Sequence, residues 1–389
     1  MTKLNLILVF SLLISSCSGQ PAKQNLLAGA ERTEHYLPLL KDKQTGIVAN
    51  HSSLVGDEHL VDFLLTKEIE LIRIFSPEHG FRGDEDAGKK IESGLDEKTG
   101  LKIVSLYGAH KKPMPEDLEN IDIMIFDLQD VGVRFYTYIS TLHYVMEACA
   151  ENNIPLIVLD RPNPNANYID GPVLRPGFES FVGMHEVPIV YGMTIGEYAL
   201  MINGEGWLKD GLSCSLKVVD CDGYKHSIHY SPPVPPSPNL PNYLSIRLYP
   251  SLCFFEGTAL SVGRGTDFPF QVFGHPDLEA GDFYFTPESR PGAATNPKLK
   301  GQFCRGFDLR NFSNPENIQQ INLEWLIKAY QNFPDKEEFF TEYFSLLSGS
   351  NELKNQIEEG LTAAEIRKTW TQDLNNFLKI RQKYLLYDD

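Results

Sequence analysis

The chain has 389 residues and a formal net charge of −17, with 35 Lys and Arg against 52 Asp and Glu. Nucleic-acid binding needs a basic surface that neutralises phosphates, so this balance argues against a nucleic-acid partner. It argues equally against a basic patch that would hold the protein on a membrane. The length suffices for about two domains.

The N-terminus has the features of an export signal. A basic residue precedes an apolar stretch over 4–14, which is shorter than the roughly 20 residues that span a bilayer. The sequence LISSC over 13–17 resembles a bacterial lipobox, which implies cleavage before Cys17 and acylation of its thiol. We expect a signal peptide over 1–16, a polar tether over 17–35, and an exported lipoprotein held at the cell envelope by its lipid. An ordinary secretory signal is the alternative.

Five short apolar runs in the first part of the chain are predicted to be strands. They are GIVANHSS (46–53), LIRIFSPEHG (71–80), KIVSLYG (102–108), IMIFDLQD (123–130) and PLIVLDRPNP (155–164). Continuous Val, Ile and Leu runs are typical of parallel strands that are buried on both faces. Helical apolar spacing over 57–68 and 137–153 separates the runs. The pattern therefore predicts a doubly wound α/β domain with a mostly parallel sheet.

Polar side chains follow these runs, at the edge where the carboxyl ends of parallel strands meet and ligands bind. They are Asn50, His51, Glu78, His79, Asp127, Gln129, Asp130, Asp160 and Arg161. We expect one active site assembled from several strand ends.

Glu78 is the leading candidate for a catalytic acid. It lies between apolar Phe75 and Phe81, and desolvation by such neighbours favours the neutral form of a carboxyl group, as general acid catalysis requires. The alternative is a surface turn in which Glu78 pairs with Arg73 or Arg82.

A second cluster follows the fourth run. Asp127, Gln129 and Asp130 precede Arg134 and Tyr136, a combination suited to hydrogen bonding with the hydroxyl and acetamido groups of a sugar. The alternative for Arg134 is a structural pair with Asp130.

Asp160 and Arg161 follow the fifth run. Arg161 could hold a substrate carboxylate with two hydrogen bonds, or it could be the structural partner of Asp160.

The chain after about residue 180 has a different texture, with a proline-rich segment over 230–242 and a largely helical C-terminus from 321. Further candidates for substrate binding stand in its loops, namely Asn239, Glu256, Arg264 and Asp267. The change in texture indicates a second domain that closes over the strand ends of the first.

Several common sites are missing from the sequence. No GxGxxG follows the first strand, and there is neither a GxSxG elbow nor a GxxxxGK[ST] loop. His51, Glu78 and His79 could be imagined as metal ligands, but no HExxH or Cys/His spacing typical of zinc is present. We expect no cofactor and no metal, and a metal-dependent amidase or esterase is kept as an alternative.

The segments SPEHGF, DLQDVGVRFYTYI, DRPNP, PPSPNLP and EGTALSVGRGTDFPF together resemble the bacterial exo-β-N-acetylmuramidase family of peptidoglycan hexosaminidases. The resemblance spans 36–389. It implies a Rossmann-like catalytic domain over 36–180, a smaller α+β domain over 181–389, and an active-site cleft between them.

The resemblance also implies a reaction, the release of N-acetylmuramic acid from the non-reducing end of peptidoglycan fragments. The key glutamate of the family falls on Glu78. The second catalytic group stays open among Asp127, Asp130, Asp160 and the 2-acetamido group of the substrate. A glycan-binding lipoprotein without turnover is the chief alternative from another class.

N-acetylmuramic acid (MurNAc) carries a lactyl carboxylate that N-acetylglucosamine lacks, so a cation is expected to read it. Arg134, Arg161 and Arg264 lie in the candidate loops. We favour Arg161 or Arg134, because each follows an apolar run that places it at the edge of the sheet.

Replacing Cys17 with Ser removes the thiol that would be acylated. We expect the variant to move from the membrane fraction to the soluble fraction, as measured by fractionation and immunoblotting. Unchanged partitioning would contradict the lipid anchor.

Overall fold

The computed structural model describes residues 26–78, 80–82 and 94–389. The predicted signal peptide, Cys17 and the first part of the tether lie outside these residues. His79 and most of the charged loop over 82–100 also lie outside them.

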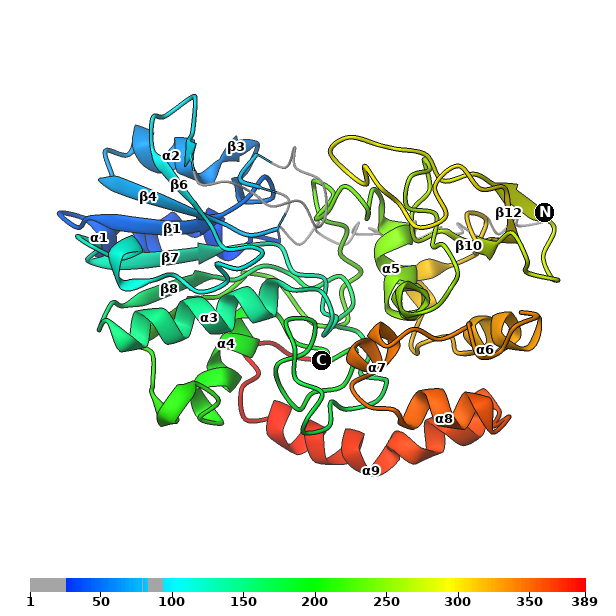
Figure 1. Ribbon diagram of the computed structural model, residues 1–389. Coiled ribbons are helices and arrows are strands. Elements are labelled where there is room, and N and C mark those ends of the chain that lie inside the picture. Colours follow the sequence, from blue (N-terminus) through cyan, green and yellow to red (C-terminus); the bar gives the residue numbers. More distant parts are fainter. Residues whose placement is uncertain (1–25, 79, 83–93) are drawn as a thin grey trace, which may run out of the picture.

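In the described part of the chain, seven strands form the sheet of the first domain (Figure 1). Their spatial order is β5-β6-β4-β1-β7-β8-β9, and every neighbouring pair is parallel except β5 with β6. The six parallel strands, counted along the chain, follow the order 3-2-1-4-5-6 of a Rossmann-like fold, which confirms the predicted class. The strands are β1 (Thr45–Ala49), β4 (Leu71–Ser76), β5 (Gly94–Leu95), β6 (Lys102–Ser105), β7 (Ile123–Asp127), β8 (Leu156–Leu159) and β9 (Leu216–Val219).

Helices cover both faces of this sheet. Successive residues of a strand point to opposite faces, so each face packs in its own core cluster. Val48, Phe126 and Val158 pack in one core cluster with α3 (Tyr138–Glu151) and α4 (Ile195–Gly204). Their chain neighbours at positions 47, 125 and 157 pack in a second cluster with α1 (Leu37–Leu40) and α2 (Leu60–Thr66). A small hairpin of β2 (Leu54–Val55) and β3 (Glu58–His59) precedes α2.

The first domain extends beyond the boundary that we predicted at residue 180. Both α4 and β9 belong to it, since β9 pairs with β8. Residues 26–35, predicted to be tether, also pack against it. Leu27 bridges Asp222, and a Cβ on Gly29 would lie 2.2 Å from the carbonyl oxygen of Val219, so only glycine fits there. Residues 26–35 and β9 are short and lack apolar periodicity, which explains why the sequence pattern did not assign them to the first domain.

The second domain combines a small sheet with helices. The antiparallel strands are ordered β10-β12-β11 and comprise β10 (Val272–His275), β11 (Phe283–Phe285) and β12 (Cys304–Asp308). The helices are α5 (Tyr243–Leu252), α6 (Glu324–Gln331), α7 (Tyr343–Ser348), α8 (Glu352–Glu358) and α9 (Ala363–Arg381). This confirms the smaller α+β domain.

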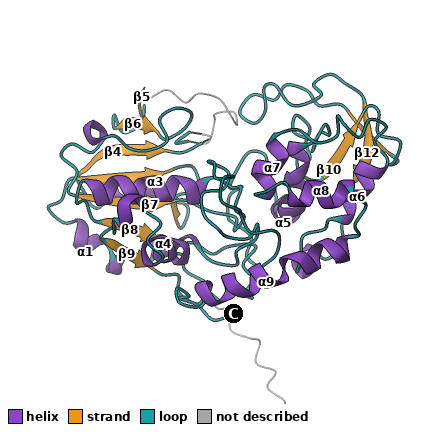
Figure 2. Ribbon diagram, turned by 60° about the horizontal axis from the view of Figure 1, so that its bottom comes forward, coloured by secondary structure: helices purple, strands orange, loops and turns teal. Residues whose placement is uncertain are grey.

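The C-terminal part of the chain ties the two domains together. The long helix α9 runs alongside both of them (Figures 1 and 2), and the segment after it returns to the first domain. There the Tyr387 hydroxyl donates to the buried Asp160 carboxylate at 2.6 Å, and the Leu386 amide donates to Glu197 at 2.8 Å.

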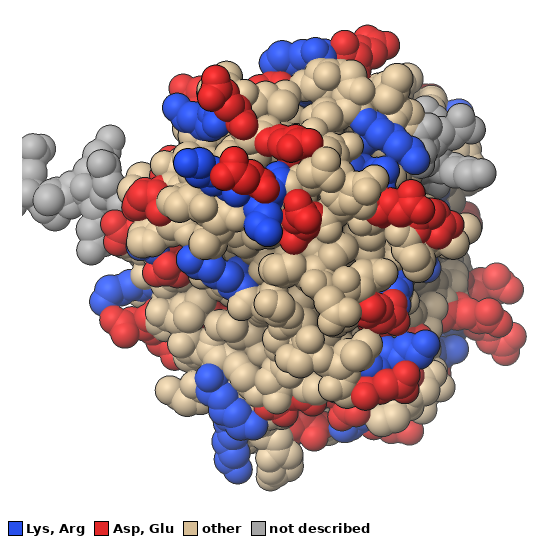
Figure 3. Space-filling view, turned by 90° about the vertical axis from the view of Figure 1, so that its left-hand side faces the viewer, with Lys and Arg blue, Asp and Glu red and all other residues tan. Residues whose placement is uncertain are grey.

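The surface carries charges of both signs. On the face shown in Figure 3, the described Lys and Arg side chains lie among Asp and Glu side chains. Among the described residues, no helix has both the length and the apolar character needed to cross a membrane.

Candidate active site

The register of two parallel strands places Glu78 beside Tyr107. Ser76 of β4 pairs with Ser105 of β6, and each of the two side chains lies two residues further on. Burial raises the pKa of the Tyr107 phenol, and the charge of Glu78 and a hydrogen bond to it raise this pKa further. Gly80 has φ 75°, a backbone conformation that favours glycine at this position after Glu78.

Glu78 lines two adjoining hollows between the domains. The small cavity has a volume of about 170 Å³, and the larger groove beside it has a volume of about 540 Å³. Of the residues that the structure describes, four line both, namely Glu78, Glu256, Arg264 and Tyr343. The first comes from the strand end of β4 and the others from the second domain, so the site lies between the domains.

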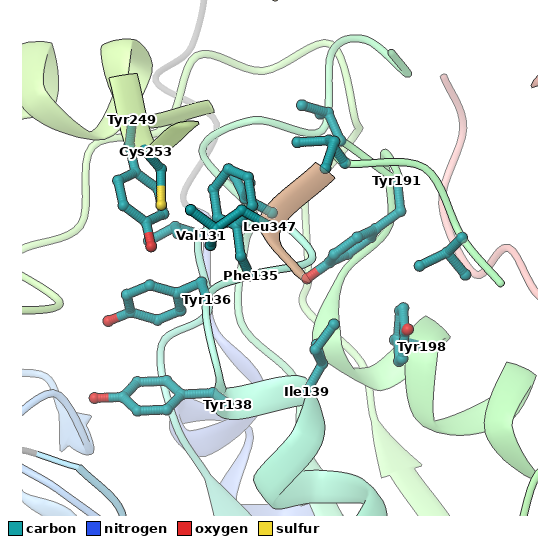
Figure 4. Packing of buried hydrophobic residues seen from close by; sticks show 14 of the residues in the cluster. Val131, Phe135, Tyr136, Tyr138, Ile139, Tyr191, Tyr198, Tyr249, Cys253 and Leu347 are labelled. Carbon is teal, nitrogen blue, oxygen red and sulfur yellow. The ribbon is translucent and has the colours of Figure 1, made fainter. Parts of the chain in front are cut away.

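Buried aromatic side chains wall the small cavity. Tyr136 and Tyr138 project side by side from the segment that leads into α3, with ring centroids 4.8 Å apart, and Tyr249 of α5 lies close to them (Figure 4). The Tyr138 hydroxyl accepts a hydrogen bond from Asn50 Nδ2 at 2.7 Å, and the Tyr136 hydroxyl donates to the Pro236 carbonyl at 2.8 Å. These bonds fix both rings.

Arg264 and Glu256 form the charged side of the site. Arg264 donates Nε and Nη2 to the Glu256 carboxylate at 2.6 and 3.2 Å, and its guanidinium lies over the Phe270 ring. Burial lowers the pKa of Arg264, but the Glu256 carboxylate outweighs this and the net pKa is raised. Arg264 therefore stays protonated beside Glu78 and Glu256.

Asp127 and Arg161 lie away from both hollows. The Arg161 guanidinium donates to both oxygens of Asp127 at 2.6 and 2.8 Å, and Nη2 also donates to the Leu54 carbonyl. Both side chains are buried, and burial raises the pKa of Asp127 despite this pair. The preference for Arg161 as a substrate reader is therefore wrong, and so is Asp160 as the partner of its guanidinium.

Arg134 is also committed to the interior. It is fully buried and donates to the carbonyls of Pro172, Val187 and Leu347 at 2.9, 2.7 and 3.0 Å. Burial lowers the pKa of this guanidinium to about 9. It fixes loops of both domains, so neither the predicted pair with Asp130 nor a contact with substrate is formed.

Three further polar residues at the strand ends form hydrogen bonds with backbone groups. Asp130 accepts from the Gly132 amide at 2.6 Å and from the Tyr191 hydroxyl, and burial raises its pKa to about 6. Gln129 donates to two carbonyls. Asp160 accepts from the Gly196 amide at the N-terminus of α4, and burial raises its pKa to about 7.

Of the other candidates, one lines the small cavity and two lie outside it. Asn239 lines the small cavity. His51 bonds the Pro235 carbonyl through Nε2 outside the cavity, and Asp267 is exposed and pairs with Arg290. The structure thus brings together Glu78, Tyr136, Asn239, Glu256 and Arg264 from the predicted set.

Three tyrosines of the site were missed as candidates. Tyr107 lies at the end of a predicted strand, a position that indicates a residue of the site. An aromatic side chain at such a position is more often part of the hydrophobic core, so it was not chosen. Tyr249 and Tyr343 lie in α5 and in α7 of the second domain, and no local pattern marks them.

A more voluminous cavity, of about 810 Å³, lies elsewhere, between α9 and the segment over 312–325. Among the described residues that line it, Glu324 alone carries a carboxylate, whereas Glu78 and Glu256 both line the smaller cavity. We therefore place the site at the smaller one. Among the described residues, no group of three or more His, Cys, Asp or Glu could hold a metal ion.

Comparison with known proteins identifies the family. Residues 45–244 match the family model of the exo-beta-N-acetylmuramidase NamZ N-terminal domain, and residues 247–387 match the model of its C-terminal domain. The chain belongs to this family and is a glycosidase.

Individual relatives agree over nearly the whole length. The peptidoglycan beta-N-acetylmuramidase NamZ of Bacillus subtilis (strain 168) is 37% identical, with 96% of each chain covered. Two crystal structures of DUF1343 family proteins from Bacteroides fragilis NCTC 9343 share the fold. One has a TM-score of 0.87 at 46% identity and covers 94% of this chain and 99% of its own. The other has a TM-score of 0.81 at 30% identity, with 94% and 100% covered.

Replacing Arg161 with Met leaves the Asp127 carboxylate buried without its cation. We expect the free energy of unfolding to fall by roughly 3–5 kcal/mol, as measured by urea denaturation. The double variant that also replaces Asp127 with Leu removes the orphaned charge and should recover much of this loss. A single variant as stable as the wild type would contradict the structural role.

Proposed function

We propose that this protein is an exo-acting glycoside hydrolase that releases N-acetylmuramic acid from the non-reducing end of peptidoglycan fragments, with Glu78 as general acid. The observation that carries the proposal is the position of Glu78 at the junction of the small cavity and the groove. The name of the Bacillus subtilis relative supports the substrate class.

The two hollows are suited to cleavage of the glycosidic bond between the terminal sugar and the next one. The small cavity, walled by buried side chains, receives that sugar, and the groove receives the sugar that leaves. A general acid must reach the oxygen between them, and Glu78 lines both sides. Tyr107 holds the carboxyl group in place through its hydrogen bond.

The second catalytic role falls to Glu256 or to the substrate. Asp127, Asp130 and Asp160 line neither hollow, so we withdraw them from this role. Glu256 lines both hollows, and two hydrogen bonds from Arg264 hold its carboxylate in place. The 2-acetamido group of the sugar is the other nucleophile that the chemistry allows.

We also propose that the enzyme works at the bacterial cell envelope, exported and held there by a lipid on Cys17. The lipobox-like sequence over 13–17 supports this location.

Replacing Glu78 with Gln removes the transferable proton and keeps the size of the side chain. We expect turnover of a natural MurNAc-containing disaccharide to fall by roughly 10²–10⁴-fold, measured by release of the free sugar. An aryl glycoside should be less affected, because its leaving group needs less protonation. Exposed Glu186 provides the matched Gln control. Near-normal turnover of the disaccharide would rule out Glu78 as the acid.

Arg264 is the arginine of the three candidates that lines the site, so we propose that it reads the lactyl carboxylate. Replacing it with Lys removes the planar fork that meets a carboxylate with two hydrogen bonds. We expect kcat/KM for MurNAc substrates to fall roughly 10–100-fold more than for the N-acetylglucosamine analogues.

The control for this experiment is the exposed Arg290, replaced by Lys. An unchanged preference between the two sugars in the Arg264 variant would mean that the lactyl group is not read by this cation.

A further inference from the structure

The side chain of Asn239 has an unusual hydrogen-bonding state. It is 2% exposed and lines the small cavity. Its Nδ2 donates to the Ala293 carbonyl at 2.9 Å, whereas its Oδ1 is buried without a hydrogen-bond partner. Among the described side chains that line the cavity or the groove, no other has such an atom.

The orientation of this amide is determined by its neighbour. Exchanging Oδ1 and Nδ2 would bring two acceptors together at Ala293, so the nitrogen must face that carbonyl. The oxygen is then left on the other side of the amide. A buried acceptor without a donor costs about 1–3 kcal/mol, and native proteins rarely keep one without a reason. A donor that arrives with a ligand would satisfy it.

The surroundings of Asn239 indicate which donor this is. Apolar and aromatic side chains line the same small cavity, including Phe135, Leu240 and Tyr249. A sugar hydroxyl would satisfy Oδ1 but would leave this apolar wall without a partner. An ammonium group would lose its hydration in such surroundings. A secondary amide with a methyl group offers both a donor and an apolar end.

We propose that Asn239 is the residue that reads the 2-acetamido group of the terminal sugar. Its Oδ1 accepts the amide N–H, and the acetyl methyl group packs against the apolar wall. This inference rests on the proposed function, because it assumes that the small cavity holds the terminal N-acetylmuramic acid. It makes acetylation of the sugar nitrogen a condition for tight binding.

Binding of the product separates this contact from catalysis. Titration calorimetry would compare N-acetylmuramic acid with its 2-deoxy analogue, which has hydrogen in place of the acetamido group. The proteins are the wild type, Asn239→Ala, and Asn375→Ala as a control from the exposed surface of α9, away from both hollows.

We expect the wild type and the control to prefer the acetamido sugar. The Asn239→Ala variant should lose roughly 5–100-fold of that preference, the equivalent of one buried hydrogen bond. The contribution of the methyl group is present in both proteins and cancels in this comparison. An unchanged preference in Asn239→Ala would overturn the assignment while leaving the proposed function intact. Failure of the wild type to bind either sugar would overturn the proposed function itself.

A second measurement needs no variant. An analogue methylated on the amide nitrogen keeps the acetyl group but has no N–H to donate. We expect it to bind the wild-type protein at least about fivefold more weakly than N-acetylmuramic acid. Equal binding of the two sugars would show that Oδ1 does not accept this hydrogen bond.

Discussion

The parallel pairing of β4 with β6 is the constraint on which the site depends. A parallel register aligns the ends of neighbouring strands, so pairing Ser76 with Ser105 makes Glu78 and Tyr107 neighbours. The sheet alone does not complete the site, because the residues at its strand ends line only one side of the cavity. The second domain supplies Glu256, Arg264 and Tyr343 from the opposite side. The geometry therefore depends equally on the bonds that hold the domains together, such as those from Arg134 to carbonyls of both domains.

Much of the fold follows from local sequence pattern. The apolar runs predict the buried parallel strands, because a strand covered by helices on both faces has no polar side. The position of Glu78 at the edge of the sheet could be predicted because it comes directly after such a run. Thr194 caps α4, because its side chain accepts a hydrogen bond from the Glu197 amide. Strand β9 was not predicted, because its residues are not continuously buried and one of them is a lysine.

The functions of the polar side chains were harder to predict than their positions. Arg134, Arg161 and Arg264 all stand in polar loops near the strand ends, and only the tertiary structure separates them. The first two bond to groups of the protein interior, one of which lies more than 200 residues away in the chain. A sequence shows which charges are present but not which of them are already paired. The same limit hid Tyr249 and Tyr343, which reach the cavity from helices of the other domain.

The buried pair of Asp127 and Arg161 is consistent with the proposed site, which lies beside the switch point of this Rossmann-like sheet and not at it. Such folds bind ligands where the strand order reverses, here between β1 and β7. Asp127 ends β7, and Arg161 occupies that position with two hydrogen bonds to it and a third to the Leu54 carbonyl. Beside this position, the ends of β4 and β6 lead to Glu78 and Tyr107, which line the small cavity. Under the proposed function, the sugar binds beside the switch point, where Glu78 lines both hollows.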